Sequence, residues 1–244
     1  MFTSQHSEFI LTPILNILKD GISASRAIGD GMDAYPMGEY LMQSLFLKMT
    51  GAQEQKLKCI CWDLATLDYE YRYDFLNKKN YGECSSYDSK NSIFNDLIAI
   101  IKKQNSSFEP SSLINSVFLA TIQSNILKLY LSSNLVAFQN KEFVFFKGKF
   151  RSLLHVNQLN YPNDSKSYSL FQSTLHTGYD EIVYKHRNRC AHNTLSYQTN
   201  KPDFSVLASS DFSYHSYFFR FAIIILIDEI FMALFKEYLG LQHN

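Results

Sequence analysis

Three side chains that could act together on a phosphate group lie close together late in the chain. Arg187 and Asn188 are adjacent, and His192 follows after three more residues. A guanidinium, an amide and an imidazole within about one and a half helical turns can bind a phosphate and move a proton. These three residues are therefore the candidate catalytic residues of the chain.

The residues around this motif favour a helix that ends just after it. On an α-helix Asn188 and His192, four residues apart, share a face, whereas Arg187 and His192 point roughly 140° apart. Two copies that met about a two-fold axis would bring both pairs into one cleft. Near the C-terminal end of a helix, the helix dipole favours the cationic form of His192.

The Arg-Asn-x-x-x-His pattern, on the helix before a final apolar helix, resembles the signature of HEPN domains, a helical family with many RNA-cutting toxins and defence ribonucleases. The resemblance covers the motif and the order of helices from about 110 to 240. It implies an endoribonuclease that uses neither a metal nor another cofactor, in which the RNA 2′-hydroxyl attacks the adjacent phosphate. Arg187 would stabilise the phosphate oxygens, His192 would be the general acid or base, and Asn188 would orient one of them.

The same resemblance implies a symmetric homodimer with the motif at its interface. It also implies a role in a toxin–antitoxin system or in antiviral (phage) defence. The partners would then be the RNA substrate and, in addition, an antitoxin or another regulatory protein. The alternative is a non-catalytic HEPN-like helical module that binds a nucleotide or a protein partner.

Charge is balanced over the whole chain but not along it. The 23 basic and 23 acidic residues give a formal net charge of zero, so total charge does not favour a nucleic-acid binder. Between Lys141 and His192, however, there are eight basic residues and only four acidic ones. Lys185 and Arg189, which flank the motif, are therefore candidate contacts to an RNA backbone, although a solvated face could have the same composition.

Three other interpretations of the motif region stay open. Arg187 and His192 could cap the helix end and contact carboxylates. His186, Cys190 and His192 lack a nearby fourth ligand with suitable spacing, which argues against a metal site. Cys190 and His192 do not face each other on a helix, which argues against a cysteine nucleophile.

Composition and periodicity predict an all-α protein. The chain is 46% hydrophobic and 19% charged, and helical spacing of apolar residues dominates. We expect a multi-helix bundle in which an N-terminal helical extension, residues 1–109, packs on a core of residues 110–244. Residues 140–165 are the exception, because β-favouring and turn-forming residues there predict a short irregular insertion with a possible strand pair.

Two other helices are predicted with defined ends, one before the motif and one after it. The sequence Thr50-Gly-Ala-Gln53 matches a capping box and predicts a helix that begins at Thr50. The final helix is predicted from Phe212 to Leu239 and is apolar nearly all round, interrupted by Arg220 and Asp228-Glu229. Such a helix is buried on most sides, and a partner subunit could cover part of it.

The remaining signals concern the compartment. The four cysteines lack the spacing of a disulfide framework or a zinc site, which is typical of reduced thiols in a cytoplasmic protein. The N-terminus has no basic region followed by an apolar run, so no signal peptide is predicted. The apolar run at 221–227 is too short to span a membrane. We therefore expect a cytoplasmic protein with no membrane partner.

Overall fold

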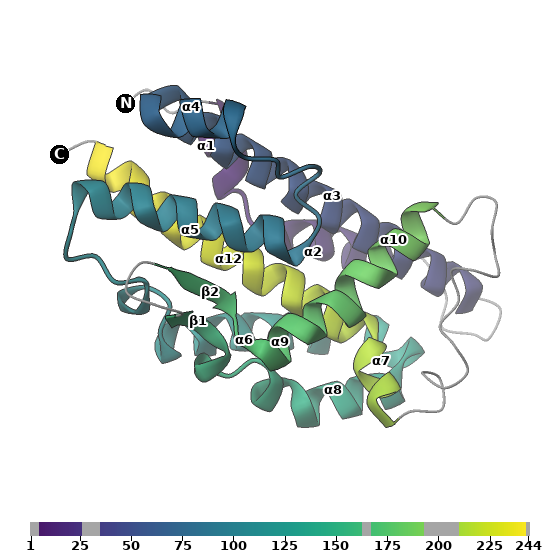
Figure 1. Ribbon diagram of the computed structural model, residues 1–244. Helices are drawn as coiled ribbons and strands as arrows, with labels where there is room; N and C mark the ends of the chain where they lie inside the picture. Colours follow the sequence, from purple (N-terminus) through teal and green to yellow (C-terminus); the bar gives the residue numbers. More distant parts are fainter. Residues whose placement is uncertain (1–4, 26–34, 163–166, 193–209, 243–244) are drawn as a thin grey trace.

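The protein is a bundle of helices around one central helix (Figure 1). The computed structural model describes residues 5–25, 35–162, 167–192 and 210–242. The all-α prediction is confirmed, since the described residues outside the helices include only one short pair of strands. The helices of the bundle are α1 (Gln5–Leu11), α2 (Leu15–Ser25), α3 (Tyr35–Leu67), α4 (Tyr69–Asn77), α5 (Tyr87–Gln104), α6 (Ser116–Leu131), α7 (Leu135–Phe138), α8 (Asn140–Leu153), α9 (Ser173–Gly178), α10 (Lys185–His192) and α12 (Tyr217–Gln242). The smaller elements are the turns η2 (Pro110–Ser112), η3 (Val156–Gln158), η4 (Tyr179–Tyr184) and η5 (Ser210–His215), and the strands β1 (Leu159–Pro162) and β2 (Tyr168–Phe171).

The last helix, α12, is the central one. Its residues from Phe221 to Ile227 are each at most 1% exposed, because α1, α3, α5, α6 and α8 all pack against it. Figure 1 shows α12 in yellow, with α3 and α5 above it and α6 and α8 below. The sequence left open that a partner subunit covers part of this helix, but helices of the same chain cover its apolar faces.

One apolar core joins the two parts of the chain. The buried side chains from α1 to α5 and those from α6 to α12 form a single cluster, with α12 contacting helices of both groups. Helices before residue 110 therefore pack directly on helices after it. Within the described ranges, no helix combines the length and the apolar character needed to cross a membrane.

Helix α3 runs without a break through the start predicted at Thr50. The Thr50 hydroxyl donates to a carbonyl of the preceding turn, and the Gln53 side chain donates across the core to the Ile224 carbonyl of α12, at 2.9 Å. The capping-box prediction is therefore wrong, because both side chains have other partners. The helix ends further on, where the Asp68 carboxylate accepts from the Tyr71 N–H at 2.8 Å and caps α4.

The prediction of an irregular insertion is wrong for residues 140–153, which form α8. Phe143, Phe146 and Phe150 recur at three- and four-residue steps and are buried against the core. Aromatic residues favour strands only when they pack on a sheet, and here a helix buries them on one face. The strand pair exists, but β2 begins beyond the predicted boundary and pairs with β1 in antiparallel fashion.

A buried ion pair ties α3 to the central helix. The Lys56 Nζ lies 2.6 Å from a carboxylate oxygen of Asp228, and the two side chains are 5% and 3% exposed. The other oxygen of Asp228 accepts from the Ile14 N–H at 2.7 Å. Both charges are thus partnered inside the core, where an unpaired charge is costly.

We expect Lys56→Met to lower the free energy of unfolding by about 3–5 kcal/mol, because Asp228 would stay buried without its cation. Urea denaturation followed by circular dichroism measures the change. Lys48→Met removes a charge from an exposed position of the same helix and should change stability by at most about 0.5 kcal/mol. Equal losses in the two variants would contradict a buried charged pair.

Candidate functional site

The motif helix α10 follows directly from a π-helical turn, η4. The Lys185 N–H donates to the Asp180 carbonyl, five residues back instead of four. One extra residue in a turn rotates the residues after it by roughly 100° relative to an unbroken α-helix. Turns of this kind are frequent at functional sites, and this one decides which face of α10 meets α3.

Arg187 is bound by the carboxylate of Glu54 on α3. Its Nε and Nη2 lie 3.1 Å and 3.0 Å from the two carboxylate oxygens, and the side chains are 21% and 10% exposed. Two parallel hydrogen bonds fix the plane of a guanidinium as well as its position. The remaining nitrogen, Nη1, donates to the side-chain oxygen of Asn188 at 3.4 Å. Arg187 therefore does contact a carboxylate, as one of the alternative interpretations expected.

A second cation is buried beside the same carboxylate. Lys90 of α5 is 1% exposed, and its Nζ donates to the Cys84 carbonyl at 2.6 Å. Burial lowers the pKa of Lys90 to about 8, against the opposing effect of the negative Glu54. Cys84 has a φ of 59°, in the left-handed region that few residues other than glycine adopt. Lys90, together with the Tyr179 hydroxyl that donates to the Ser85 carbonyl at 2.7 Å, holds this loop in place.

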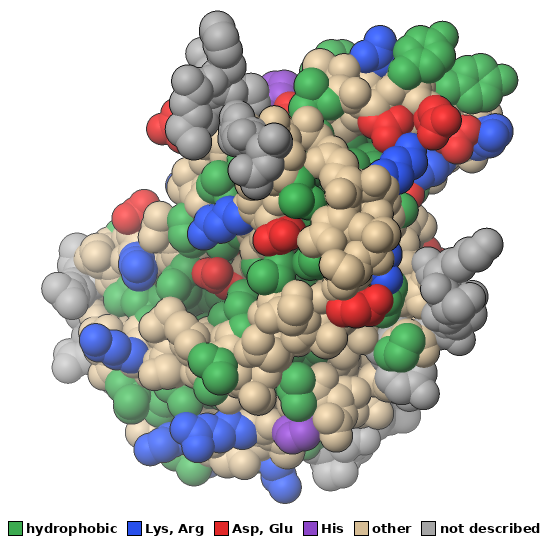
Figure 2. Space-filling model, turned by 90° about the vertical axis from the view of Figure 1, so that its left-hand side faces the viewer, with side chains coloured by type: hydrophobic (Ala, Val, Ile, Leu, Met, Phe, Trp, Pro, Cys, Tyr) green, Lys and Arg blue, Asp and Glu red, His purple; other side chains and the backbone are tan. Residues whose placement is uncertain are grey.

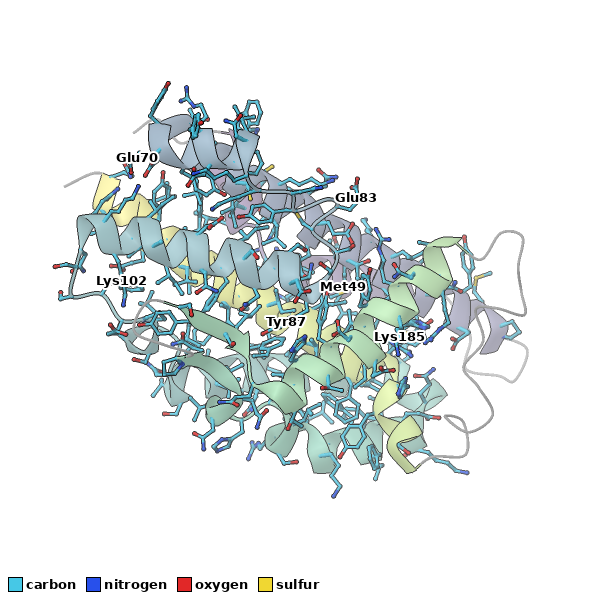
Figure 3. The ribbon with its side chains drawn as sticks, in the orientation of Figure 1. Met49, Glu70, Glu83, Tyr87, Lys102 and Lys185 are labelled. Atoms are coloured by element: carbon cyan, nitrogen blue, oxygen red, sulfur yellow. The ribbon has the colours of Figure 1, made fainter. Side chains whose placement is uncertain are left out.

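A groove lies beside this network. It has a volume of about 820 Å³, is lined by the loop after α4 and the first turns of α5, and reaches Tyr184 just before α10. Its charged side chains are largely paired, Lys79 with Asp96 at 2.5 Å and Glu83 with Lys58 at 2.6 Å. Figure 3 shows Glu83 on this loop and Lys185 on the neighbouring α10. The groove is polar but has no excess of positive charge.

The predicted site residues have different surroundings. Arg187 and Asn188 are in contact, whereas His192 is the last residue of α10 and its side chain lies outside the described part of the protein. Lys185 is exposed and pairs with Glu181 at 2.5 Å, one turn earlier. Arg189 is partly buried, and burial lowers its pKa.

His186, one residue before Arg187, faces the core. Its Nε2 lies 3.3 Å from the Tyr217 hydroxyl and 3.5 Å from the Cys190 sulfur, and its ring centre lies 5.0 Å from that of Phe46. Burial, helped by the nearby positive charge of Arg220, lowers the pKa of His186 to about 2. His186 is therefore a neutral, packed histidine. Among the residues that the structure describes, no group of three or more His, Cys, Asp or Glu side chains could hold a metal ion.

Glu54 is the site residue that sequence reasoning missed. Its one sequence signal is the polar run Gln53-Glu54-Gln55-Lys56 inside a helix with an apolar stripe. Gln53, Glu54 and Lys56 are all buried, so each needs a polar partner in the core. The run predicts that partners exist, but not which residues they are.

Comparison with known proteins does not assign the chain. No protein-family model, curated protein or solved structure matches it.

We expect the protein to lose stability on acidification through His186. The folded-state pKa of about 2 lies below the ordinary value of about 6.5, so below pH ~6.5 the unfolded chain binds a proton that the folded chain does not. The stability linked to neutral His186 is fully present well above pH ~6.5, and about 3 kcal/mol of it is lost near pH ~4.5. Urea denaturation at both pH values should show a smaller loss for His186→Gln than for wild type. His155→Gln changes an exposed histidine and should keep the wild-type difference; equal pH dependence in all three proteins would contradict the assignment.

Proposed function

We propose that this protein is a HEPN-like, metal-independent endoribonuclease in which Arg187 stabilises the phosphate and His192 is the general acid or base. The observation that supports it is the Glu54–Arg187 pair. It holds a guanidinium in a fixed orientation on the helix whose last residue is His192. A catalytic donor acts best when it is fixed before the substrate binds.

The geometry suggests how Arg187 would act. Glu54 uses Nε and Nη2, so Nη1, now turned toward Asn188, is the nitrogen available to a phosphate oxygen. Because Glu54 also neutralises much of the positive charge, Arg187 would contribute a directed hydrogen bond more than a general attraction for RNA. Asn188 could orient either the phosphate or the imidazole.

The reaction needs only groups of the RNA and the protein. The 2′-hydroxyl oxygen forms a bond to the adjacent phosphorus and the bond to the 5′-oxygen breaks, which leaves a 2′,3′-cyclic phosphate and a 5′-hydroxyl. His192 would take the proton of the 2′-hydroxyl or give one to the leaving 5′-oxygen. Arg187 would stabilise the charge that builds on the non-bridging oxygens.

The active unit in this proposal is a homodimer. Arg187 and His192 lie roughly 140° apart on an α-helix, so a second copy about a two-fold axis would complete the cleft. By its resemblance to HEPN ribonucleases, the protein would act in the cytoplasm as a toxin or in phage defence, restrained by an antitoxin or another regulatory protein.

The ion pair also favours a second function. A partly buried arginine bound through two nitrogens to one carboxylate is a common structural device. If Arg187 has only this role, the protein is a non-catalytic helical module that binds a nucleotide or a protein partner. His192 separates the two functions, because its replacement leaves the Glu54–Arg187 pair intact.

We expect wild-type protein to cleave RNA in the presence of EDTA, and His192→Ala and Arg187→Ala to slow cleavage by about 10²–10⁴-fold. Gel electrophoresis of end-labelled RNA measures the rates. His155→Ala, at an exposed histidine away from the motif, is the matched control and should cleave at the wild-type rate.

Stability must be measured beside activity, because Arg187→Ala leaves Glu54 without its partner. Glu54→Gln keeps the shape of the side chain but removes its charge, and it should lower both stability and cleavage. A His192→Ala variant that cuts RNA as fast as wild type would refute the catalytic role, as would a folded wild-type protein that cuts none of a varied set of RNAs.

A further inference from the structure

The positive charge that the sequence concentrates between residues 141 and 192 does not gather at the motif. Lys185 is paired with Glu181 and Arg187 with Glu54. The cations of α8 differ, since they are exposed and, among the described residues, form no ion pair with an acid.

One side of α8 is basic and carries no acid. Lys147 and Arg151 are four residues apart and share a face, and the exposed Val144 lies next to Arg151 around the helix. Glu142, the acid of this helix, lies five residues before Lys147 and therefore roughly 140° away from it. In Figure 2, Lys and Arg side chains gather along the lower edge, the level at which Figure 1 places α8, and no acidic side chain is seen among the described residues there.

The basic side of α8 continues onto the neighbouring α6, where the surface has two grooves. Lys128 of α6 and Arg151 of α8 line a groove of about 420 Å³, and its other lining residues are Ser124, Leu127, Leu131 and Ser132. At Ser124 it meets a second groove, of about 590 Å³, which runs along the first half of α6 and is lined by Thr121 and Asn125 among others. We call this surface the α6–α8 face, and its polar residues include Thr121, Ser124, Asn125, Lys128, Lys147 and Arg151.

We infer that the α6–α8 face binds the sugar–phosphate backbone of single-stranded RNA, without regard to base sequence. Lys128 and Arg151 lie beside serine hydroxyls in one groove, and Lys147 lies one turn from Arg151 on α8. Cations, hydroxyls and amides are the groups with which proteins contact phosphate and sugar oxygens. The choice of RNA as the polymer rests on the proposed ribonuclease function.

Other occupants fit this face less well. Val117, Ala120, Leu127 and Leu131 give the two grooves an apolar side along α6, interrupted at Ser124. A second copy that met this side about a two-fold axis would bring its own cations against those of the α6–α8 face, which is unfavourable. An anionic membrane could contact the exposed Val117, Leu131 and Val144, but it binds cations that project from a surface, whereas Lys128 and Arg151 line a groove. The face has cations and hydrogen-bonding groups spread along a groove, which suits a chain of phosphates.

The test is the salt dependence of RNA binding. A fluorescein-labelled 2′-O-methyl RNA lacks the hydroxyl needed for cleavage, so its fluorescence anisotropy reports binding alone. Lys128→Gln/Arg151→Gln removes two phosphate contacts and should reduce the slope of log affinity against log salt by about 1.4. From about 50 to about 200 mM salt, wild type should then lose roughly sevenfold more affinity than the variant. Lys141→Gln/Lys149→Gln removes the same charge from other positions of α8 and should keep the wild-type slope.

Each outcome bears on the inference separately from the ribonuclease proposal. Equal slopes for wild type and both double variants, or no binding of the RNA by wild type, would overturn the inference even if the protein cleaves RNA. Wild type that binds RNA through this face but does not cut it supports the inference and refutes the catalytic proposal alone. Binding of anionic lipid vesicles in place of RNA, or self-association that Lys128→Gln/Arg151→Gln abolishes, would assign the face to a membrane or to a second copy and overturn the inference.

Discussion

The fold depends on the need to enclose α12 on every side. A helix that is apolar all round cannot lie on the surface of a bundle, so helices from both halves of the chain must surround it. Residues 5–104 supply α1, α3 and α5, and residues 116–153 supply α6 and α8. With its own chain on all sides, α12 has no apolar face left for a partner. A dimer of this protein would therefore form through other helices.

The packing of α3 against both α12 and α10 explains why α3 carries buried polar residues. Gln53 reaches the α12 backbone at Ile224, Lys56 pairs with Asp228, and Glu54, between them in sequence, turns to Arg187 on α10. Each of these groups would be costly to bury alone, and each is matched by a group on another helix. The same segment of α3 therefore sets the position of the central helix and of the motif helix. A substitution in this segment of α3 would therefore disturb the position of both helices.

Sequence patterns predicted what depends on local periodicity and missed what depends on distant partners. The all-α fold and the buried final helix follow from the spacing of apolar residues alone. Glu54 lies 133 residues from Arg187, and no local pattern pairs the two. The helical state of residues 140–153 was missed because the strand preference of aromatic residues depends on what they pack against, and here packing against the core selects a helix. The capping box at Thr50 failed for the same reason, since its side chains found partners within the fold.

In the proposed ribonuclease, the Glu54–Arg187 pair implies that one part of the surface orients a phosphate and another part holds the RNA chain. A polyanion is attracted by charge that is not already neutralised, and Arg187 and Lys185 are each paired with a carboxylate. The motif could therefore orient a phosphate but contribute little to holding an RNA chain. The charge suited to that task lies on α6 and α8, on exposed side chains without acidic partners among the described residues. An RNA that is held at one place and cut at another must span the distance between them, so binding at the α6–α8 face would favour extended chains over short fragments.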